Sequence, residues 1–92
     1  PDFRRFRALA LAYDVLGAGG TAPAIFNAAN EVAVASFLQG ELPFVRITDV
    51  IESALARVPA APATAIDDVL EADRRARSAA AAAVVQPLAR SA

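Results

Sequence analysis

The most distinctive polar residues of this chain lie together in the alanine-rich stretch 27–38. Asn27, Asn30 and Glu31 are spaced i, i+3, i+4, so on a helix their three side chains project from one face. Asn costs roughly 0.7 kcal/mol relative to Ala in a helix interior, yet two of them stand in an otherwise strongly helix-forming segment. Glu31 has no nucleophile or base beside it, which argues against direct catalysis.

Two interpretations of this signature, Asn27, Asn30 and Glu31, follow from the residues. In the first, the side chains hydrogen-bond to loop backbone within or beside the domain, since leaving a buried amide unpaired costs roughly 1–3 kcal/mol. In the second, they anchor a neighbouring domain. The burial of the two asparagines distinguishes these interpretations, because internal bonding to loops favours the first and exposure favours the second.

The residue types that are missing restrict the chemistry further. The chain contains no Cys and no His, and all nine of its basic residues are Arg. A disulfide, a thiolate nucleophile, a sulfur-ligated metal and a Ser-His-Asp triad are therefore excluded within the chain. Any chemistry would rest on carboxylates alone, so we predict no catalytic residue, no cofactor-binding residue and no enzymatic activity for the isolated chain.

Two local patterns invite a ligand but fit a structural role better. Asp67, Asp68 and Glu71 could offer oxygen ligands to a hard cation, but carboxylates are favoured at a helix start anyway by the helix dipole. The glycine run at residues 17–20 could cradle a phosphate, but no strand precedes it and the chain has no Lys. We therefore predict no metal site and no phosphate site.

Length and charge place the chain in a broad class. Ninety-two residues with a net charge of −1 make one domain, and the arginines are scattered rather than gathered in a basic stripe. No run approaches the ~18 apolar residues of a membrane span, and no signal peptide opens the chain. We expect neither a nucleic-acid nor a membrane partner, and a cytoplasmic location. Because the chain starts without Met, we expect it to be part of a longer polypeptide.

Hydrophobic periodicity, together with glycine and proline, predicts an all-α bundle of four helices joined by loops. Glycines stop the first helix, and a linker with two prolines, residues 59–63, precedes the last. Residues 41–47 are expected to form an extended connector from which Phe44 and Ile47 fill the core. The expected helices cover residues 3–16, residues 22–39, a third segment capped by Thr48 or Asp49, and a fourth from after Thr64 to about Gln86, stopped by Pro87.

Helix caps and buried faces can also be predicted. Thr21 should cap the second helix, and Asp67 should occupy a capping-box position three residues after Thr64. Arg4, Arg5 and Arg7 should face solvent or a partner. The expected apolar positions are Phe3, Phe6, Leu9, Ala10, Tyr13 and Leu16 in the first helix, Ile25, Phe26, Ala29, Val32, Ala33, Ser36 and Phe37 in the second, Val50, Ile51, Ala54, Leu55 and Val58 in the third, and Ile66, Val69, Leu70, Ala76, Ala80, Ala83 and Val84 in the fourth.

Several stretches that together cover nearly the whole chain follow the pattern of one known family. They are residues 6–13, residues 19–34 with the Asn-Ala-Ala-Asn-Glu sequence at 27–31, Phe37, Leu38, Phe44 and Ile47, and residues 68–73 with Ala76 and Arg77. In these stretches the chain resembles the C-terminal domain of 1-deoxy-D-xylulose 5-phosphate reductoisomerase. Two positions depart from the usual family pattern, because Arg7 stands where the family usually has Pro, and Arg46 stands where it usually has Asp.

The resemblance implies an oxidoreductase of the non-mevalonate route of isoprenoid biosynthesis. The whole enzyme would convert 1-deoxy-D-xylulose 5-phosphate to 2-C-methyl-D-erythritol 4-phosphate with NADPH and Mg²⁺ or Mn²⁺, as a homodimer. Residues 1–92 would be its C-terminal helical domain, packed on the upstream catalytic domain of the same polypeptide. No catalytic, cofactor-binding or metal-binding residue of the family maps onto this chain. The alternative is a free-standing helical protein-interaction module that uses the same bundle.

Overall fold

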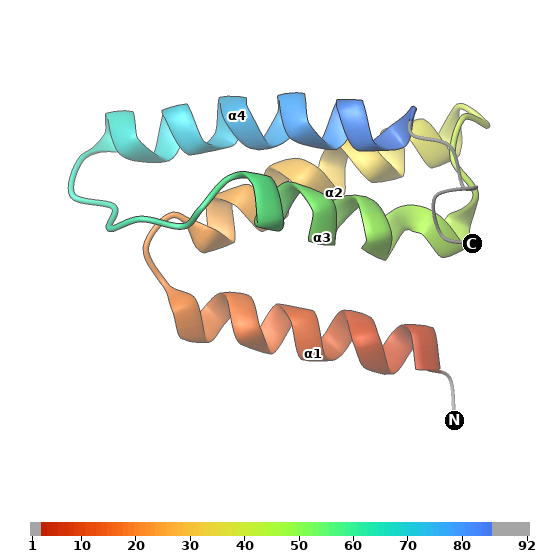
Figure 1. The fold of residues 1–92 in the computed structure, drawn as a ribbon, viewed down its shortest axis with the longest axis horizontal. Coiled ribbons are helices and arrows are strands. Elements are labelled where there is room, and N and C mark those ends of the chain that lie inside the picture. Colours follow the sequence, from red (N-terminus) through yellow and green to blue (C-terminus); the bar gives the residue numbers. More distant parts are fainter. Residues whose placement is uncertain (1–2, 86–92) are drawn as a thin grey trace.

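The computed structural model describes residues 3–85, with side chains from residue 7 onward. This part of the chain contains no strand, so the expected all-α bundle of four helices is confirmed (Figure 1). Asp2, Gln86 and Pro87, and the side chains of Phe3, Arg4, Arg5 and Phe6, lie outside the described part. The elements are α1 (Phe3–Ala18), α2 (Ala22–Leu38), a 3-10 turn η1 (Phe44–Arg46), α3 (Ile47–Arg57) and α4 (Ile66–Val84).

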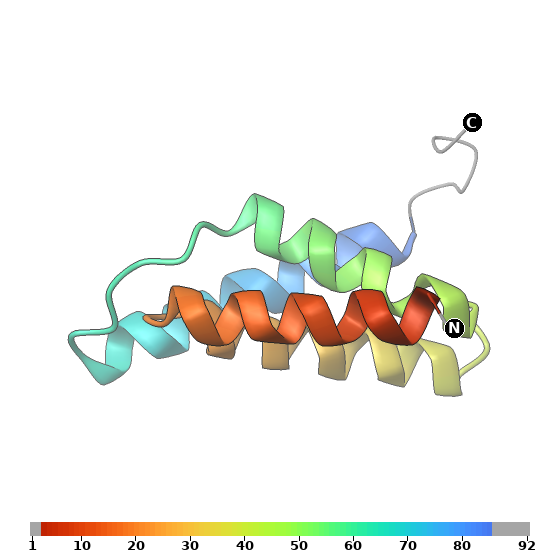
Figure 2. The same cartoon turned by 90° about the horizontal axis from the view of Figure 1, so that it is seen from below.

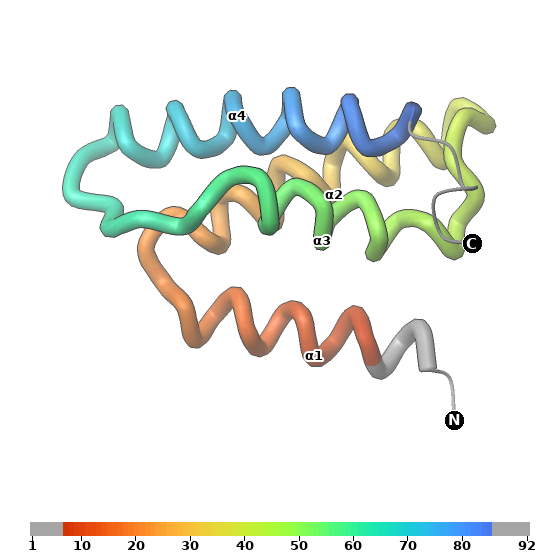
Figure 3. Tube along the Cα trace, in the orientation of Figure 1, coloured from red at the N-terminus to blue at the C-terminus, as the bar shows by residue number. Residues whose placement is uncertain are grey.

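Helices α2, α3 and α4 form the centre of the bundle, and α1 lies against α2 and α3 on the side away from α4 (Figures 1 and 3). α2 and α4 run in the same direction, whereas α1 and α3 run in the opposite one. Seen from below, α1 crosses in front of the bundle between α3 and α2 (Figure 2). α1 therefore touches the bundle along one side only.

The core is built from alanines and a few larger aliphatic side chains. Ile25 of α2 and Val50 of α3 are the largest side chains that are fully buried in the described part. The residues of α4 that are buried are all alanines, and because Ala carries a single methyl group the neighbouring backbones can approach closely. These buried alanines of α4 are Ala72, Ala76, Ala80 and Ala83.

The predicted buried face of α3 is correct, but those of α1 and α4 are partly wrong. Val50, Ile51, Ala54 and Val58 are buried, and Leu55 is half-buried against them. Helical spacing identifies apolar residues but not which side of a helix finds a partner. In α1 the inward residues are Leu11 and Val15. Seven residues of α1 and α4 that were expected to be buried are instead exposed: Leu9, Ala10, Tyr13 and Leu16 in α1, and Ile66, Val69 and Leu70 in α4.

The turn between α1 and α2 is fixed by contacts with the proline linker. The backbone N–H of Thr21 donates to the carbonyl oxygen of Ala61 at 2.8 Å, and the N–H of Ala61 donates to Thr21 Oγ1 at 3.0 Å. Thr21 precedes α2 as expected, but its side chain does not cap the helix. The prediction of a side-chain cap is wrong because the hydroxyl accepts its hydrogen bond from the linker instead.

The segment between α2 and α3 is less extended than expected. The turn η1 continues directly into α3, which begins at Ile47 and not after Thr48 or Asp49. Arg46 precedes this helix, and its Nε donates to Asp49 Oδ2 at 3.0 Å. Ile47 packs against the core as expected, but Phe44 is 64% exposed and makes an edge-to-face contact with Phe37, with ring centroids 5.5 Å apart.

The start of α4 uses Asp68 and not Asp67. Asp68 Oδ2 accepts hydrogen bonds from the Thr64 hydroxyl at 2.9 Å, from the Thr64 N–H at 3.1 Å and from the Ala65 N–H at 3.0 Å. Because the helix begins at Ile66, one residue later than a Thr64 cap requires, the capping position shifts by one residue. The hydrogen bond from the Thr64 hydroxyl has the largest effect in lowering the pKa of the Asp68 carboxyl, and the two backbone N–H groups lower it further.

Substitution of Gly20 tests the contact between turn and linker. A Cβ at Gly20 would lie 2.3 Å from the Ala61 carbonyl oxygen, and Gly20 has a φ of +55°. For Gly20→Ala we expect the free energy of unfolding to fall by roughly 2–4 kcal/mol, measured by urea unfolding with circular dichroism. Gly19→Ala is the matched control, because its φ is +65° but its Cβ would meet nothing within 4 Å. Equal losses would contradict the proposed clash.

The role of Asp68 gives a pH dependence. A carboxyl whose pKa is lowered by folding stabilises the folded state above its unfolded pKa, and this stabilisation is lost as the pH falls through the folded pKa. Asp68→Ala should therefore lower the urea midpoint at pH 7, and the difference from the parent chain should shrink below about pH 4. Asp67→Ala, one residue away, should lower the midpoint less at pH 7. A difference that persists unchanged in acid would refute this assignment.

Candidate functional site

Asn27 and Glu31 lie next to each other on the exposed side of α2. Asn27 Nδ2 donates to Glu31 Oε2 at 3.4 Å, a long hydrogen bond, and the two residues are one helical turn apart. Glu31 Oε1 also accepts from Arg77 Nη2 of α4, at 2.8 Å. The exposed part of the signature therefore belongs to a contact between α2 and α4.

Arg77 joins the signature to a second carboxylate. Its Nε donates to Asp73 Oδ1 at 2.6 Å, one helical turn away on α4. The hydrogen bonds to Asp73 and then to Glu31 raise the pKa of the Arg77 guanidinium, so it remains charged. Asn27, Glu31, Arg77 and Asp73 form one chain of hydrogen bonds across two helices, which we call the α2–α4 polar network.

Asn30 lies apart from this network. It is half-buried and about 100° around α2 from Glu31. Among the described residues, neither asparagine side chain bonds to loop backbone, and Asn27 is exposed. The hydrogen bonds that the first interpretation of the signature requires are therefore not found in this part of the chain.

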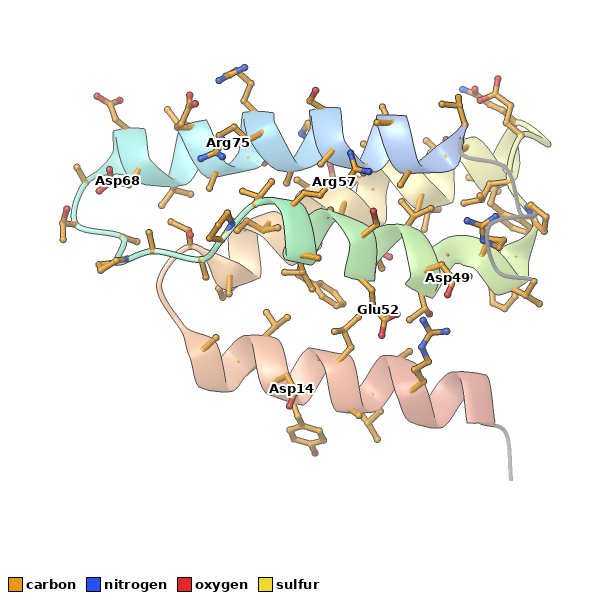
Figure 4. The ribbon with its side chains drawn as sticks, viewed as in Figure 1. Asp14, Asp49, Glu52, Arg57, Asp68 and Arg75 are labelled. Carbon is orange, nitrogen blue, oxygen red and sulfur yellow. The ribbon has the colours of Figure 1, made fainter. Side chains whose placement is uncertain are left out.

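A second polar cluster connects α1 to α3. Arg7 binds both Asp49 and Glu52, with Nη2 at 2.8 Å from Asp49 Oδ1, and Figure 4 shows both carboxylates on the side of α3 that faces α1. The hydrogen bonds to Glu52 and then to Asp49 raise the pKa of Arg7. Arg7 therefore has partners within the bundle. Arg7 and Arg46, the two departures from the family pattern, both bind Asp49.

Two further carboxylates of α4, those of Asp68 and Glu71, are bound by neighbouring groups. Glu71 Oε2 lies 2.6 Å from Arg74 Nη2, and Asp68 caps the helix. Within residues 7–85, no group of three or more acidic side chains is arranged to hold a metal ion. Of the helices that the structure describes, none is long and apolar enough to cross a membrane.

Comparison with known proteins gives the class and then the family. Residues 1–79 match the family model of the DXP reductoisomerase C-terminal domain. Relatives carrying the name 1-deoxy-D-xylulose 5-phosphate reductoisomerase include one from Dechloromonas aromatica (strain RCB), 62% identical over 77 residues. A second, from Methylococcus capsulatus (strain ATCC 33009 / NCIMB 11132 / Bath), is 56% identical over 80 residues. These matches cover 84% and 87% of this chain but 19% and 20% of the relatives.

A solved structure agrees with the sequence comparison. The 1-deoxy-D-xylulose 5-phosphate reductoisomerase from Zymomonas mobilis in complex with NADPH superposes with a TM-score of 0.85 at 40% identity. The match covers 95% of this chain and 23% of that one. The fold and the sequence thus define a small helical domain that is found in a larger reductoisomerase. The chain belongs to the DXP reductoisomerase C-terminal domain family, and it spans about a fifth of the length of the relatives it matches.

Glu31→Gln tests whether the α2–α4 polar network stabilises the bundle. The substitution removes the carboxylate charge of Glu31 that Arg77 binds, but the ion pair between Arg77 and Asp73 remains. The side chains of Glu31 and Arg77 are about half exposed. Exposed ion pairs contribute little to stability, so the thermal midpoint of the 92-residue chain should stay unchanged within error. Ala33→Asp, which places a carboxylate at a fully buried position of the same helix, should abolish cooperative unfolding. A large fall in the thermal midpoint for Glu31→Gln would show that the α2–α4 polar network stabilises the bundle.

Proposed function

We propose that residues 1–92 form the C-terminal domain of a 1-deoxy-D-xylulose 5-phosphate reductoisomerase. The observation that carries this proposal is the family match over residues 1–79, with 62% identity to the Dechloromonas aromatica relative. The whole enzyme would convert 1-deoxy-D-xylulose 5-phosphate to 2-C-methyl-D-erythritol 4-phosphate. It would oxidise NADPH, the ligand of the Zymomonas mobilis structure, and would use Mg²⁺ or Mn²⁺.

The domain has a supporting role in this proposal. The chain has no His, Cys or Lys, and its best-placed carboxylates are occupied by arginines or by a helix start. A hydride transfer to a phosphorylated sugar needs a nucleotide site, a metal site and phosphate-binding cations. All of these would lie in the upstream catalytic domain of the same polypeptide. The assembled enzyme would be a cytoplasmic homodimer.

The signature would contact that catalytic domain. Asn27 and Glu31 are both exposed, Glu31 accepts from Arg77, and Asn27 donates to Glu31, so the two side chains are positioned before a partner arrives. Prearranged polar groups lose less conformational entropy when they bind, which favours a specific contact. Asn30, on the adjacent flank of α2, would extend this contact toward α1. The second interpretation of the signature is the one we propose.

The activity of the separated and complete proteins tests the proposal. The full-length polypeptide should oxidise NADPH when 1-deoxy-D-xylulose 5-phosphate and Mg²⁺ are added, as followed by NADPH absorbance. The 92-residue chain alone should show no turnover above the rate without protein, because it lacks the hydride donor's binding site. Turnover by the 92-residue chain would refute the supporting role. An inactive full-length polypeptide that still folds would refute the assigned reaction.

A further inference from the structure

The exposed flank of α1 is an interaction surface. We propose that Leu9, Tyr13 and Leu16, here called the α1 stripe, dock on the part of the polypeptide that precedes this domain. The proposal rests on the proposed function, because it needs the longer enzyme chain. It adds the face through which the domain is held, and this face contains no residue of the signature.

The stripe is apolar, continuous and open to solvent. The exposed fractions of Leu9, Tyr13 and Leu16 are 52%, 67% and 70%, and the residues are spaced i, i+4, i+7. This spacing places them along one line on the helix surface. Single exposed apolar residues are ordinary, but three large ones in a line form a patch of the kind that marks an interaction site.

The direction of the stripe follows from the position of Arg7. Arg7 points to α3, where it binds Asp49 and Glu52. At 100° per residue, Leu9, Tyr13 and Leu16 lie about 200°, 240° and 180° around the helix from Arg7. The stripe therefore faces away from α3.

α1 is held weakly by the bundle itself. Of its described side chains only Val15 is buried, while Leu11 and Ala12 are half-buried. The ion pairs of Arg7 are about 40% exposed and add little to stability. A helix in a protein gains most of its stability from packing an apolar face. α1 carries apolar residues on two flanks, and the bundle covers only one of them.

The preceding polypeptide is the occupant that fits this flank. The chain spans about a fifth of the matched relatives, and the family model describes a C-terminal domain, so most of such an enzyme precedes α1. A chain that leads into α1 brings its own surface to this helix at a high effective concentration. The matching surface would be apolar, with an acceptor at its edge for the Tyr13 hydroxyl, since a buried phenol needs a hydrogen-bond partner.

A second copy of this chain fits the stripe less well. Three partly exposed side chains offer on the order of 400 Å² of surface, whereas a standard stable complex buries about 800 Å² on each partner. A covalently attached neighbour needs less area, because it does not lose the translational freedom of a separate molecule. The area therefore favours a partner within the same polypeptide.

Thiol accessibility in the full-length enzyme tests the inference. Tyr13→Cys and Ser78→Cys are compared, because Ser78 is exposed on α4, on the side of the bundle away from α1. For each variant the rate of alkylation by iodoacetamide is measured in the native protein and in urea, with the modified peptide resolved by mass. We expect the native-to-unfolded rate ratio at position 13 to be at least tenfold lower than at position 78.

Two outcomes would overturn the inference. A native-to-unfolded rate ratio near one at position 13 would show that the stripe is open to solvent in the enzyme. Protection at position 13 that disappears on dilution to monomers would identify a second copy as the occupant. If position 13 is alkylated as fast in the native enzyme as in urea while the enzyme still oxidises NADPH, docking through the α1 stripe is refuted and the proposed function is not.

A second variant covers the case in which Tyr13→Cys itself disturbs the contact. Tyr13→Glu places a charge inside the proposed interface, and Asp14→Asn changes charge at the adjacent exposed position. In the full-length enzyme, Tyr13→Glu should speed proteolytic release of the C-terminal domain at least tenfold, while Asp14→Asn should leave the rate near that of the parent. The same rate for both variants would contradict docking through the stripe.

Discussion

The pair of hydrogen bonds between Thr21 and Ala61 is the constraint on which the bundle depends. These bonds join two connections that are forty residues apart in the chain, and Thr21 is 3% exposed. They place the beginnings of α2 and α4 at the same end, so the two helices run parallel and bury Ile25 and Ala28 against Ala72 and Ala76. Gly20 is required there because a side chain would strike the carbonyl of Ala61.

The alanines of α4 are the second condition of this geometry. Ala76 and Ala80 are fully buried, and larger residues at these positions would push α2 and α4 apart. Because α2 and α4 pack closely, Glu31 of α2 can reach Arg77 of α4, and the α2–α4 polar network lies beside the buried alanines. Small side chains bury little apolar area each, so the bundle gains less from its core than a leucine-rich one would. Burial of further apolar surface against a neighbouring domain would therefore add to the stability of this bundle.

The sequence predicted the helices because glycine and proline mark their ends unambiguously. Gly19, Gly20 and Gly40 all adopt positive φ in the structure, and the proline linker separates α3 from α4 as expected. The starts of α3 and α4 were misplaced locally, and further contacts were missed because a distant residue takes part. The Thr21 hydroxyl binds the linker, the Arg7 cluster joins residues more than forty positions apart, and Glu31 meets Arg77 only after the bundle has formed. Local periodicity carries no information about such pairs.

The wrong burial predictions in α1 have a different cause. The spacing of Leu9, Tyr13 and Leu16 predicts a buried face, and the bundle leaves that face exposed. The spacing of apolar residues reflects which side chains are buried in the complete protein. The structure covers about a fifth of the length of the matched relatives, so a face that another domain buries is exposed in it. Under the proposed docking, the spacing would be correct for the enzyme and wrong only for the separate domain. The same reasoning applies to the signature, whose exposed Asn27 and Glu31 have no chemistry of their own in this bundle and fit an interface with the catalytic domain.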